Sequence, residues 1–353
     1  MSKATPIPKN PLDLLIDSLN PALHSGLYYN ENHQLCLGSP DSEALKKELS
    51  SHNMSDMETF EIVNTKYSIK DLSKAQEQLL EQRELLGISA VGFDILNNGL
   101  ALFVPDIKTR NSNDFASIVN MPIVIVPDIY VNNKPIASEP KEEKQDLISE
   151  KEIQARITLK SGSWLAKSSG NNWCTLGAWA LHNNGDVGFV TSAHGWGSIG
   201  CRAYSGSTII GTSTEKQQAG SVDAIFFRKN SNLTWGGYRN GNPIDQISNP
   251  RVNDSVTMLG VRGTKTGRVM YINISGNFED GYFSDMFCYN FMPIAGDSGS
   301  AIIARRNSQD VLVGLNKSQW WTDNVVDDNN TTTWGAGSKA FNIDRALDLE
   351  FAN

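Results

Sequence analysis

The sequence predicts a chain of two parts, a small α+β region followed by an all-β region that forms a barrel or a sandwich. Composition changes sharply near residue 153, because all eight tryptophans and 24 of the 29 glycines lie after it. The later part contains short apolar runs separated by Gly, Asn, Ser and Asp clusters, a pattern typical of about ten short strands. A length of 353 residues also favours more than one domain.

The N-terminal part begins with a segment that the sequence predicts to be loosely organised, residues 1–58, with one helix near Ser42–Leu49. A capping box of Ser68 and Asp71 then predicts the start of a helix with one apolar face. Gly87 is placed to end that helix.

Two apolar runs joined by Asn97-Asn98-Gly99 predict a hairpin. A short helix at 114–119 and a strand at 122–126 complete a small α+β domain over residues 59–131. Residues 132–154 hold two prolines and mixed charge with few apolar residues, which predicts a solvated, charged linker.

The totals exclude several classes of function. The formal net charge is −8, and no dense block of Lys and Arg suggests nucleic acid as the partner. No apolar run approaches the length of a membrane span, and the first residues do not read as a secretory signal peptide. The cellular compartment therefore stays open.

The four cysteines, Cys36, Cys174, Cys201 and Cys288, match no zinc-site spacing, because the sequence has no Cys-x-x-Cys or His-x-x-His pair. Either one disulfide forms or all four are small buried side chains. We expect no metal and no cofactor.

The candidate base is His194, at the end of a predicted strand where small residues form a tight turn. A histidine there would project at a sheet edge rather than into a core. The only other histidine of this region, His182, precedes Asn183-Asn184-Gly185 and is interpreted as a turn residue.

Asp223 leads directly into an apolar run, so it is placed to be buried. A buried carboxylate is costly unless it is paired or hydrogen-bonded. A histidine N–H is one natural partner, and a backbone cap at the strand end is the alternative.

The pentapeptide Gly296-Asp297-Ser298-Gly299-Ser300 is either an ordinary turn or a loop that holds a nucleophile. A serine hydroxyl needs a neighbouring base, and the oxyanion formed by its attack needs aimed donors. Gly296 would let its own N–H and that of Ser298 converge as an oxyanion hole. The order His194, Asp223, Ser298 is that of the chymotrypsin type of serine triad.

These motifs make the C-terminal region resemble a chymotrypsin-like serine protease of the bacterial streptogrisin and α-lytic protease group. The segment 191–195 resembles the family's TAAHC or TAGHC, and 222–227 resembles the strand that carries the orienting acid. The segment 296–300 resembles GDSGG, and 174–177 resembles the CSLGF stretch that opens the first barrel.

The resemblance implies that residues 155–353 form a double β-barrel serine endopeptidase acting on a protein or peptide. His194 would be the base, Asp223 the orienting acid and Ser298 the nucleophile.

The hairpin at 261–269 resembles the arginine-plus-STTG hairpin of the bacterial enzymes. It implies that Arg262 pairs with Asp297 and supports the oxyanion loop; an exposed hairpin arginine is the alternative.

The sequence also departs from the family. Gly195 replaces the cysteine that usually follows the base, so the usual disulfide from Cys174 is missing, and Cys201 is a substitute partner to test. Cys288 has no evident downstream partner. Ser300 replaces the second glycine of GDSGG.

For specificity, Met292 occupies the position where trypsin-like members place an aspartate. This predicts a neutral or apolar pocket. Gly314, Leu315 and Asn316 are expected to form the strand that pairs with the substrate backbone by β-augmentation.

The helix-then-hairpin pattern of the N-terminal part resembles the pro-region of these proteases. It implies an intramolecular inhibitor or folding aid that is released by cutting in the linker. The family is extracellular, whereas the start of this sequence shows no signal peptide. Two alternatives remain, a non-catalytic binding protein on the same barrel and an intracellular regulatory protease.

Overall fold

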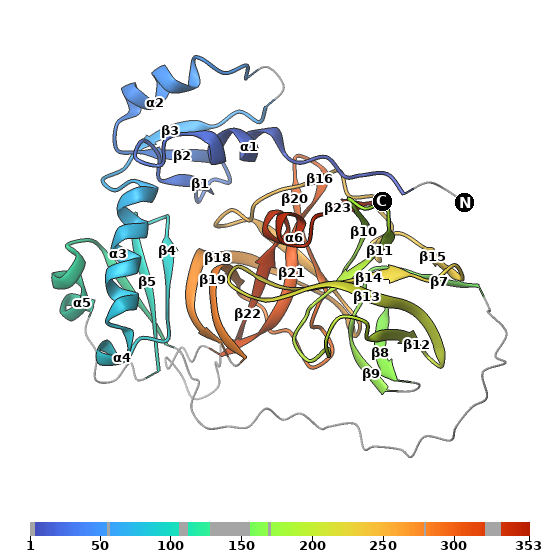
Figure 1. Cartoon of the computed structure of the whole chain (residues 1–353). Helices are drawn as coiled ribbons and strands as arrows, with labels where there is room; N and C mark the ends of the chain where they lie inside the picture. Colours follow the sequence, from blue (N-terminus) through green and yellow to red (C-terminus); the bar gives the residue numbers. More distant parts are fainter. Residues whose placement is uncertain are drawn as a thin grey trace.

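The computed structural model describes residues 4–54, 57–105, 112–127, 156–168, 171–278, 280–321 and 333–353 (Figure 1). The linker predicted at residues 132–154 lies outside these ranges. Within them, no helix combines the length and the apolar character that crossing a bilayer requires.

The segment 1–58 was predicted to be loosely organised, but its described residues, 4–54 and 57–58, have regular structure. Its elements, with one strand just beyond it, are α1 (Pro11–Ser18), β1 (Gly26–Tyr29), β2 (Leu35–Ser39), α2 (Ser42–Leu49) and β3 (Glu61–Asn64). Strand β2 pairs antiparallel with β1 and parallel with β3. Both helices pack leucines against this sheet in one apolar cluster. The expectation fails because the apolar residues are irregularly spaced in sequence and meet only in the folded chain.

The predicted α+β order is confirmed in residues 69–127. The elements are α3 (Ile69–Glu81), α4 (Arg83–Leu86), β4 (Ala90–Asp94), β5 (Gly99–Val104), α5 (Ser112–Val119) and β6 (Ile123–Pro127). Helix α3 starts at the predicted capping box, in which the Asp71 N–H donates to Ser68 Oγ at 3.2 Å and the Ser68 N–H donates to Asp71 Oδ2 at 2.9 Å. Gly87 ends the helical segment in the left-handed conformation, with φ 63°.

An eight-stranded antiparallel sheet carries the base and the acid. In spatial order its strands are β23 (Leu349–Ala352), β10 (Ala178–His182), β11 (Val187–Thr191), β14 (Val222–Lys229), β13 (Thr208–Ala219), β12 (Arg202–Ser205), β8 (Trp164–Ser168) and β9 (Asn171–Thr175). Residues 222–227 of β14 are all buried, so this strand runs through the core of the sheet.

A second, ten-stranded sheet carries the serine loop. Its C-terminal strands are β17 (Ser255–Gly260), β20 (Ala301–Arg306), β21 (Gln309–Trp321), β22 (Thr333–Lys339), β19 (Gly281–Tyr289) and β18 (Gly263–Phe278), with β16 (Gln246–Ile247) paired to β21. A short parallel pair, β7 (Ile157–Leu159) and β15 (Leu233–Trp235), and helix α6 (Ala340–Ala346) complete the region. The two sheets curl around separate apolar cores, which confirms the all-β, double-barrel class.

The N-terminal α+β unit is part of this second sheet, because β4 pairs antiparallel with β18 (Figure 1). Ile272 lies opposite Phe93, and Gly276 lies opposite Ala90. A Cβ on Gly276 would lie 2.4 Å from the carbonyl oxygen of Ser89, so only glycine permits this approach. One apolar core continues across the junction. The change in composition near residue 153 therefore does not mark a boundary between two separately packed cores.

The start of the chain makes a second contact with the C-terminal region. The Ile7 N–H donates to the Phe351 carbonyl at 2.8 Å, which extends the sheet beyond β23. Nearby, the buried guanidinium of Arg251 pairs with Asp13 at 3.2 Å and with Glu58 at 2.7 Å. Removing such a partner leaves a buried charge uncompensated, which costs about 3–5 kcal/mol. Through Ile7, Asp13 and Glu58, the described N-terminal residues are thus connected to the C-terminal region.

Candidate active site

His194 lies in the loop that follows β11. Its backbone N–H donates to Asp223 Oδ1 at 2.8 Å, and its ring atom Nδ1 lies 2.5 Å from Asp223 Oδ2. Gly195 has φ 78°, and a Cβ there would lie 2.5 Å from the Trp173 ring. The loop and the ring are therefore oriented by the same carboxylate.

Asp223 is the second residue of β14 and is buried. Its Oδ1 also accepts the Ala193 N–H at 3.0 Å, and its own N–H donates to Ser338 Oγ at 3.0 Å. Burial acts to raise the pKa of this carboxyl, but His194, Lys317 and the backbone hydrogen bonds outweigh it and lower the pKa below 3.8. The carboxylate is thus charged at neutral pH, and Nδ1 is the ring nitrogen that carries a proton toward it.

Ser298 Oγ lies 2.9 Å from His194 Nε2. With the proton held on Nδ1, Nε2 is left to accept the hydrogen of the serine hydroxyl. The structure thus brings the three sequence-predicted residues into one continuous chain of contacts, Asp223 to His194 to Ser298.

The loop that carries Ser298 depends on two glycines. Gly296 has φ 97° and Gly299 has φ 84°, both in the left-handed region. A Cβ on Gly299 would lie 2.0 Å from Thr191 Oγ1. Thr175 Oγ1 donates to the Gly296 carbonyl at 2.6 Å. Within the described residues, neither the Gly296 nor the Ser298 N–H donates to a protein acceptor, so both backbone donors remain available for an oxyanion.

The cation that supports this loop is Lys265, and the prediction of Arg262 is wrong. Lys265 Nζ lies 2.7 Å from Asp297 Oδ2, which also accepts the Ile294 N–H at 3.0 Å. Arg262 is exposed in the turn that joins β17 to β18. Arg262 lies in the turn, outside the paired residues, whereas Lys265 lies within the paired strand and its Nζ reaches the loop.

The strand prediction at Gly314, Leu315 and Asn316 is also wrong. Gly314 and Leu315 pair with β20 on one side and with β22 on the other. The Asn316 N–H donates to the Ser300 carbonyl at 2.8 Å, and its carbonyl accepts the Gly299 N–H at 2.8 Å. These backbone groups are already used, so they cannot bind a substrate strand.

Residues further along β21 pair with β22, for example Ser318 with Ala336, but lie beyond the last residue paired to β20. Among the described residues, no strand pairs with the other edge of this part of β21, which is the kind of edge that an added strand can use. Met292, the residue predicted to set specificity, lies half-buried in the loop between β19 and Gly296.

Two charged residues at the site were missed by the sequence reasoning. Lys317 Nζ lies 3.6 Å from Asp223 Oδ2 and 2.5 Å from Asp280 Oδ1. Asp280 occupies the turn between β18 and β19, far from the motif residues in sequence. One nitrogen of His194 and one oxygen each of Asp223 and Asp280 lie within 4.8 Å of one another. The ammonium already contacts both carboxylates, which makes this cluster a charge-paired network rather than a cation site.

The cysteines and the second histidine take structural positions. All four cysteines are free, so the Cys174–Cys201 disulfide considered from the sequence is absent. The Cys174 thiol lies 3.4 Å from Thr191 Oγ1, and burial raises its pKa to about 12. His182 ends β10, and its Nδ1 accepts the Asn184 N–H at 3.1 Å, in keeping with a turn residue.

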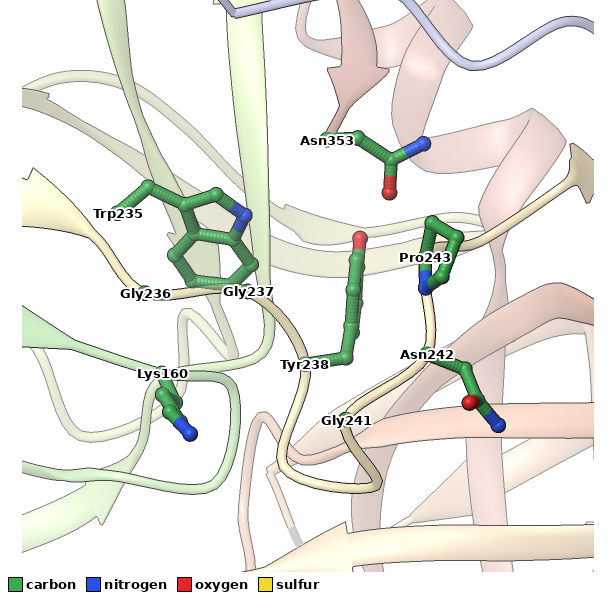
Figure 2. Close-up of a pocket in the computed structure, with 9 residues that line it drawn as sticks. All are labelled: Lys160, Trp235, Gly236, Gly237, Tyr238, Gly241, Asn242, Pro243 and Asn353. Atoms are coloured by element: carbon green, nitrogen blue, oxygen red, sulfur yellow. The ribbon is translucent and has the colours of Figure 1, made fainter. Parts of the chain in front are cut away.

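A separate pocket of about 260 Å³ lies where β15 leads into the loop at residues 236–243 (Figure 2). Trp235 and Tyr238 form aromatic walls, and Lys160 and Asn353 also line it. No residue of the candidate active site lines this pocket.

No family model matches the chain, and no curated protein sequence matches it. Several solved structures of bacterial proteases are similar to it. Nocardiopsis protease is 20% identical, with a TM-score of 0.46 over 56% of this chain and 100% of that chain. Thermobifida fusca protease A is 18% identical, with a TM-score of 0.43 over 55% of this chain and 98% of that chain.

A glutamic acid-specific serine protease is 20% identical, with a TM-score of 0.44 over 55% of this chain and 100% of that chain. Each match leaves nearly half of this chain uncovered.

Proposed function

We propose that this protein is a serine endopeptidase. Ser298 Oγ attacks the scissile carbonyl carbon while its proton passes to His194 Nε2. The C–N bond then breaks, and the imidazolium gives that proton to the leaving amine. A water molecule repeats the two steps to release the acyl group and restore the serine. Asp223 keeps Nδ1 protonated and stabilises the imidazolium that forms.

The observation that carries this proposal is the continuous contact from Asp223 Oδ2 to Nδ1, at 2.5 Å, and from Nε2 to Ser298 Oγ, at 2.9 Å. A serine becomes nucleophilic only beside a base, and the base must be held in the correct tautomer. Three side chains from three distant segments meet these requirements together. The two unengaged N–H groups of Gly296 and Ser298 add donors for the developing oxyanion.

The preference for neutral or apolar side chains before the scissile bond is also part of this proposal. It depends on the resemblance that puts Met292 at the position where trypsin-like members have an aspartate, because a thioether there would not select Lys or Arg. A peptide library profile dominated by apolar residues at that position is expected. A profile dominated by cleavage after Lys or Arg would contradict this specificity while leaving the peptidase proposal intact.

The N-terminal region acts, in this proposal, as an intramolecular folding aid or inhibitor made with the protease. Its strand β4 extends the sheet that carries the serine loop, and both regions share one apolar core. Cutting in the linker should therefore give two pieces that stay associated. Size-exclusion chromatography after limited proteolysis tests this, because immediate separation into two folded pieces would contradict it.

The decisive experiment is labelling with a fluorophosphonate probe, on the intact chain and after limited proteolysis. We expect one label at Ser298 in at least one form. Ser298→Ala should abolish it, whereas Ser300→Ala, a serine two residues away in the same loop, should retain it. No labelling in either form would contradict the peptidase and favour a non-catalytic binding protein on the same barrel.

A further inference from the structure

Lys317 places a buried positive charge next to Asp223. Its side chain is 1% exposed, and it directly follows Asn316 on β21. The ammonium lies 4.1 Å from the centre of the Phe283 ring, a cation–π contact, in addition to its two carboxylate partners. Burying an ammonium is costly unless its partners compensate it. A lysine here is therefore explained by the charges that it contacts rather than by packing alone.

Asp280 supplies the second carboxylate. It is exposed at the turn of the β18–β19 hairpin, where its Oδ2 accepts the Gln218 Nε2–H at 3.1 Å. Without Lys317, this carboxylate and that of Asp223 would face each other at short range, and like charges disfavour each other's ionisation. The ammonium between them contacts both carboxylates and offsets this repulsion.

Among the described residues, three charged groups lie at or beside the Asp223–His194 contact, and they come from three different elements. Asp223 comes from β14, Asp280 from the β18–β19 turn and Lys317 from β21. Two further titratable groups lie close to this network. The Cys174 thiol is neutral because burial raises its pKa to about 12, and Lys216 is turned to the carbonyls of residues 196 and 197.

We propose that Lys317 and Asp280 are positioning residues that form a charge pair beside the Asp223–His194 contact and set the proton affinity of His194. This inference rests on the proposed function for its consequence, since the base must be neutral before it can accept the serine proton. The pair thereby sets the lowest pH at which the peptidase works.

The two members of the pair act in opposite directions. A positive charge near an imidazole ring disfavours its protonated form, and Lys317 carries such a charge. A negative charge favours the protonated form, and Asp280 carries such a charge. Replacing Lys317 by methionine leaves two carboxylates at the ring, and replacing Asp280 by asparagine leaves an ammonium with one carboxylate fewer.

The test is an NMR titration of the His194 ring in full-length protein. The protein carries Ser298→Ala, which prevents self-cleavage, and the titration itself requires no enzymatic activity. Lys317→Met should raise the pKa of His194, and Asp280→Asn should lower it, each by roughly one pH unit. The double variant should fall between them. Lys70→Met and Glu77→Gln, on the exposed face of α3, are matched charge controls that should not shift it.

Methionine suits the buried position because its chain packs against the same aromatic rings without a charge. If Lys317→Met still fails to fold, Asp280→Asn, which changes an exposed residue, decides the matter alone. Titrations of all folded variants that agree within about 0.2 pH unit would overturn the inference.

A second measurement separates this inference from the proposed function. In the active enzyme, kcat/KM falls at low pH as the base becomes protonated. This acid limb of the pH profile should move to higher pH in Lys317→Met and to lower pH in Asp280→Asn. If the NMR titrations shift as expected but no form hydrolyses any peptide, the charge pair stands and the peptidase proposal fails. If the enzyme is active and neither profile shifts, the inference fails and the peptidase proposal stands.

Discussion

The candidate site has two halves, the loop that carries Ser298 and the strand that carries Asp223. In each half a lysine contacts an aspartate, but the surroundings differ. Near the nucleophile, the Lys265 side chain is 25% exposed, and among the described residues its ammonium forms an ion pair with Asp297 alone. On the acid side, Lys317 is 1% exposed and contacts two carboxylates and an aromatic ring. The same pair of residue types therefore serves two purposes.

The difference follows from solvent. Lys265 sits at the rim, where water can screen its charge, so its contribution is to hold the Asp297 loop in shape. Lys317 sits where water is excluded, so its charge acts strongly on every nearby group. Changes on the nucleophile side should alter loop geometry and stability, and changes on the acid side should alter protonation.

The largest effect should come from the contact that joins the two halves. Ser298→Ala or His194→Ala should lower kcat on a peptide substrate by a factor on the order of 10⁶. The double variant should be little worse than either single variant, because the two residues act as a unit. Kinetics on purified protein give the measurement. Activity that survives both substitutions would place the chemistry elsewhere.

Asp223→Asn should lower kcat by a factor on the order of 10⁴, because the amide favours the wrong tautomer of His194. The same variant should respond differently to acid. The lowered pKa of Asp223 means that its charge stabilises the fold above about pH 4 and loses this effect as the pH falls further. The free energy of unfolding measured with urea should therefore fall more steeply below about pH 4 in the parent protein than in the variant. If the free energies of unfolding of the two proteins changed with pH in the same way, the claim that Asp223 is charged in the folded protein would be wrong.

Lys265→Met should destabilise the nucleophile loop by about 1–3 kcal/mol, because the buried Asp297 loses its only lysine partner in the described chain. We expect a lower kcat/KM with an unchanged acid limb, unlike the Lys317 variant. Arg262→Met, at the neighbouring exposed turn, is the matched control and should change stability by no more than about 0.5 kcal/mol. Equal effects of the two substitutions would return the supporting role to Arg262.

The smallest effect should come from reductant. The four cysteines are free, so no covalent link joins the two halves of the site. Dithiothreitol should leave the unfolding midpoint unchanged, and mass spectrometry of alkylated, unfolded protein should count four labels. A reductant-sensitive midpoint would reveal a disulfide.

Local signals predicted much of this molecule. The Ser68–Asp71 capping box, the Asn97-Asn98-Gly99 hairpin and the order of elements from 69 to 127 depend on neighbouring residues, and the structure has them where the sequence placed them. The prediction that the segment 1–58 is loosely organised is wrong, because its helices and strands are stabilised mainly by contact with one another.

The sequence by itself determined which residue types stand at the turns and strand ends that carry the candidate site, His194, Asp223 and Ser298, because glycine turns and apolar runs are local properties. Only the tertiary structure decided that Lys265 rather than Arg262 reaches Asp297, that Lys317 and Asp280 lie beside His194, and that β4 joins the second sheet. Those contacts connect residues far apart in the chain, and which side chain fills a buried space depends on the packing of strands that no local pattern specifies.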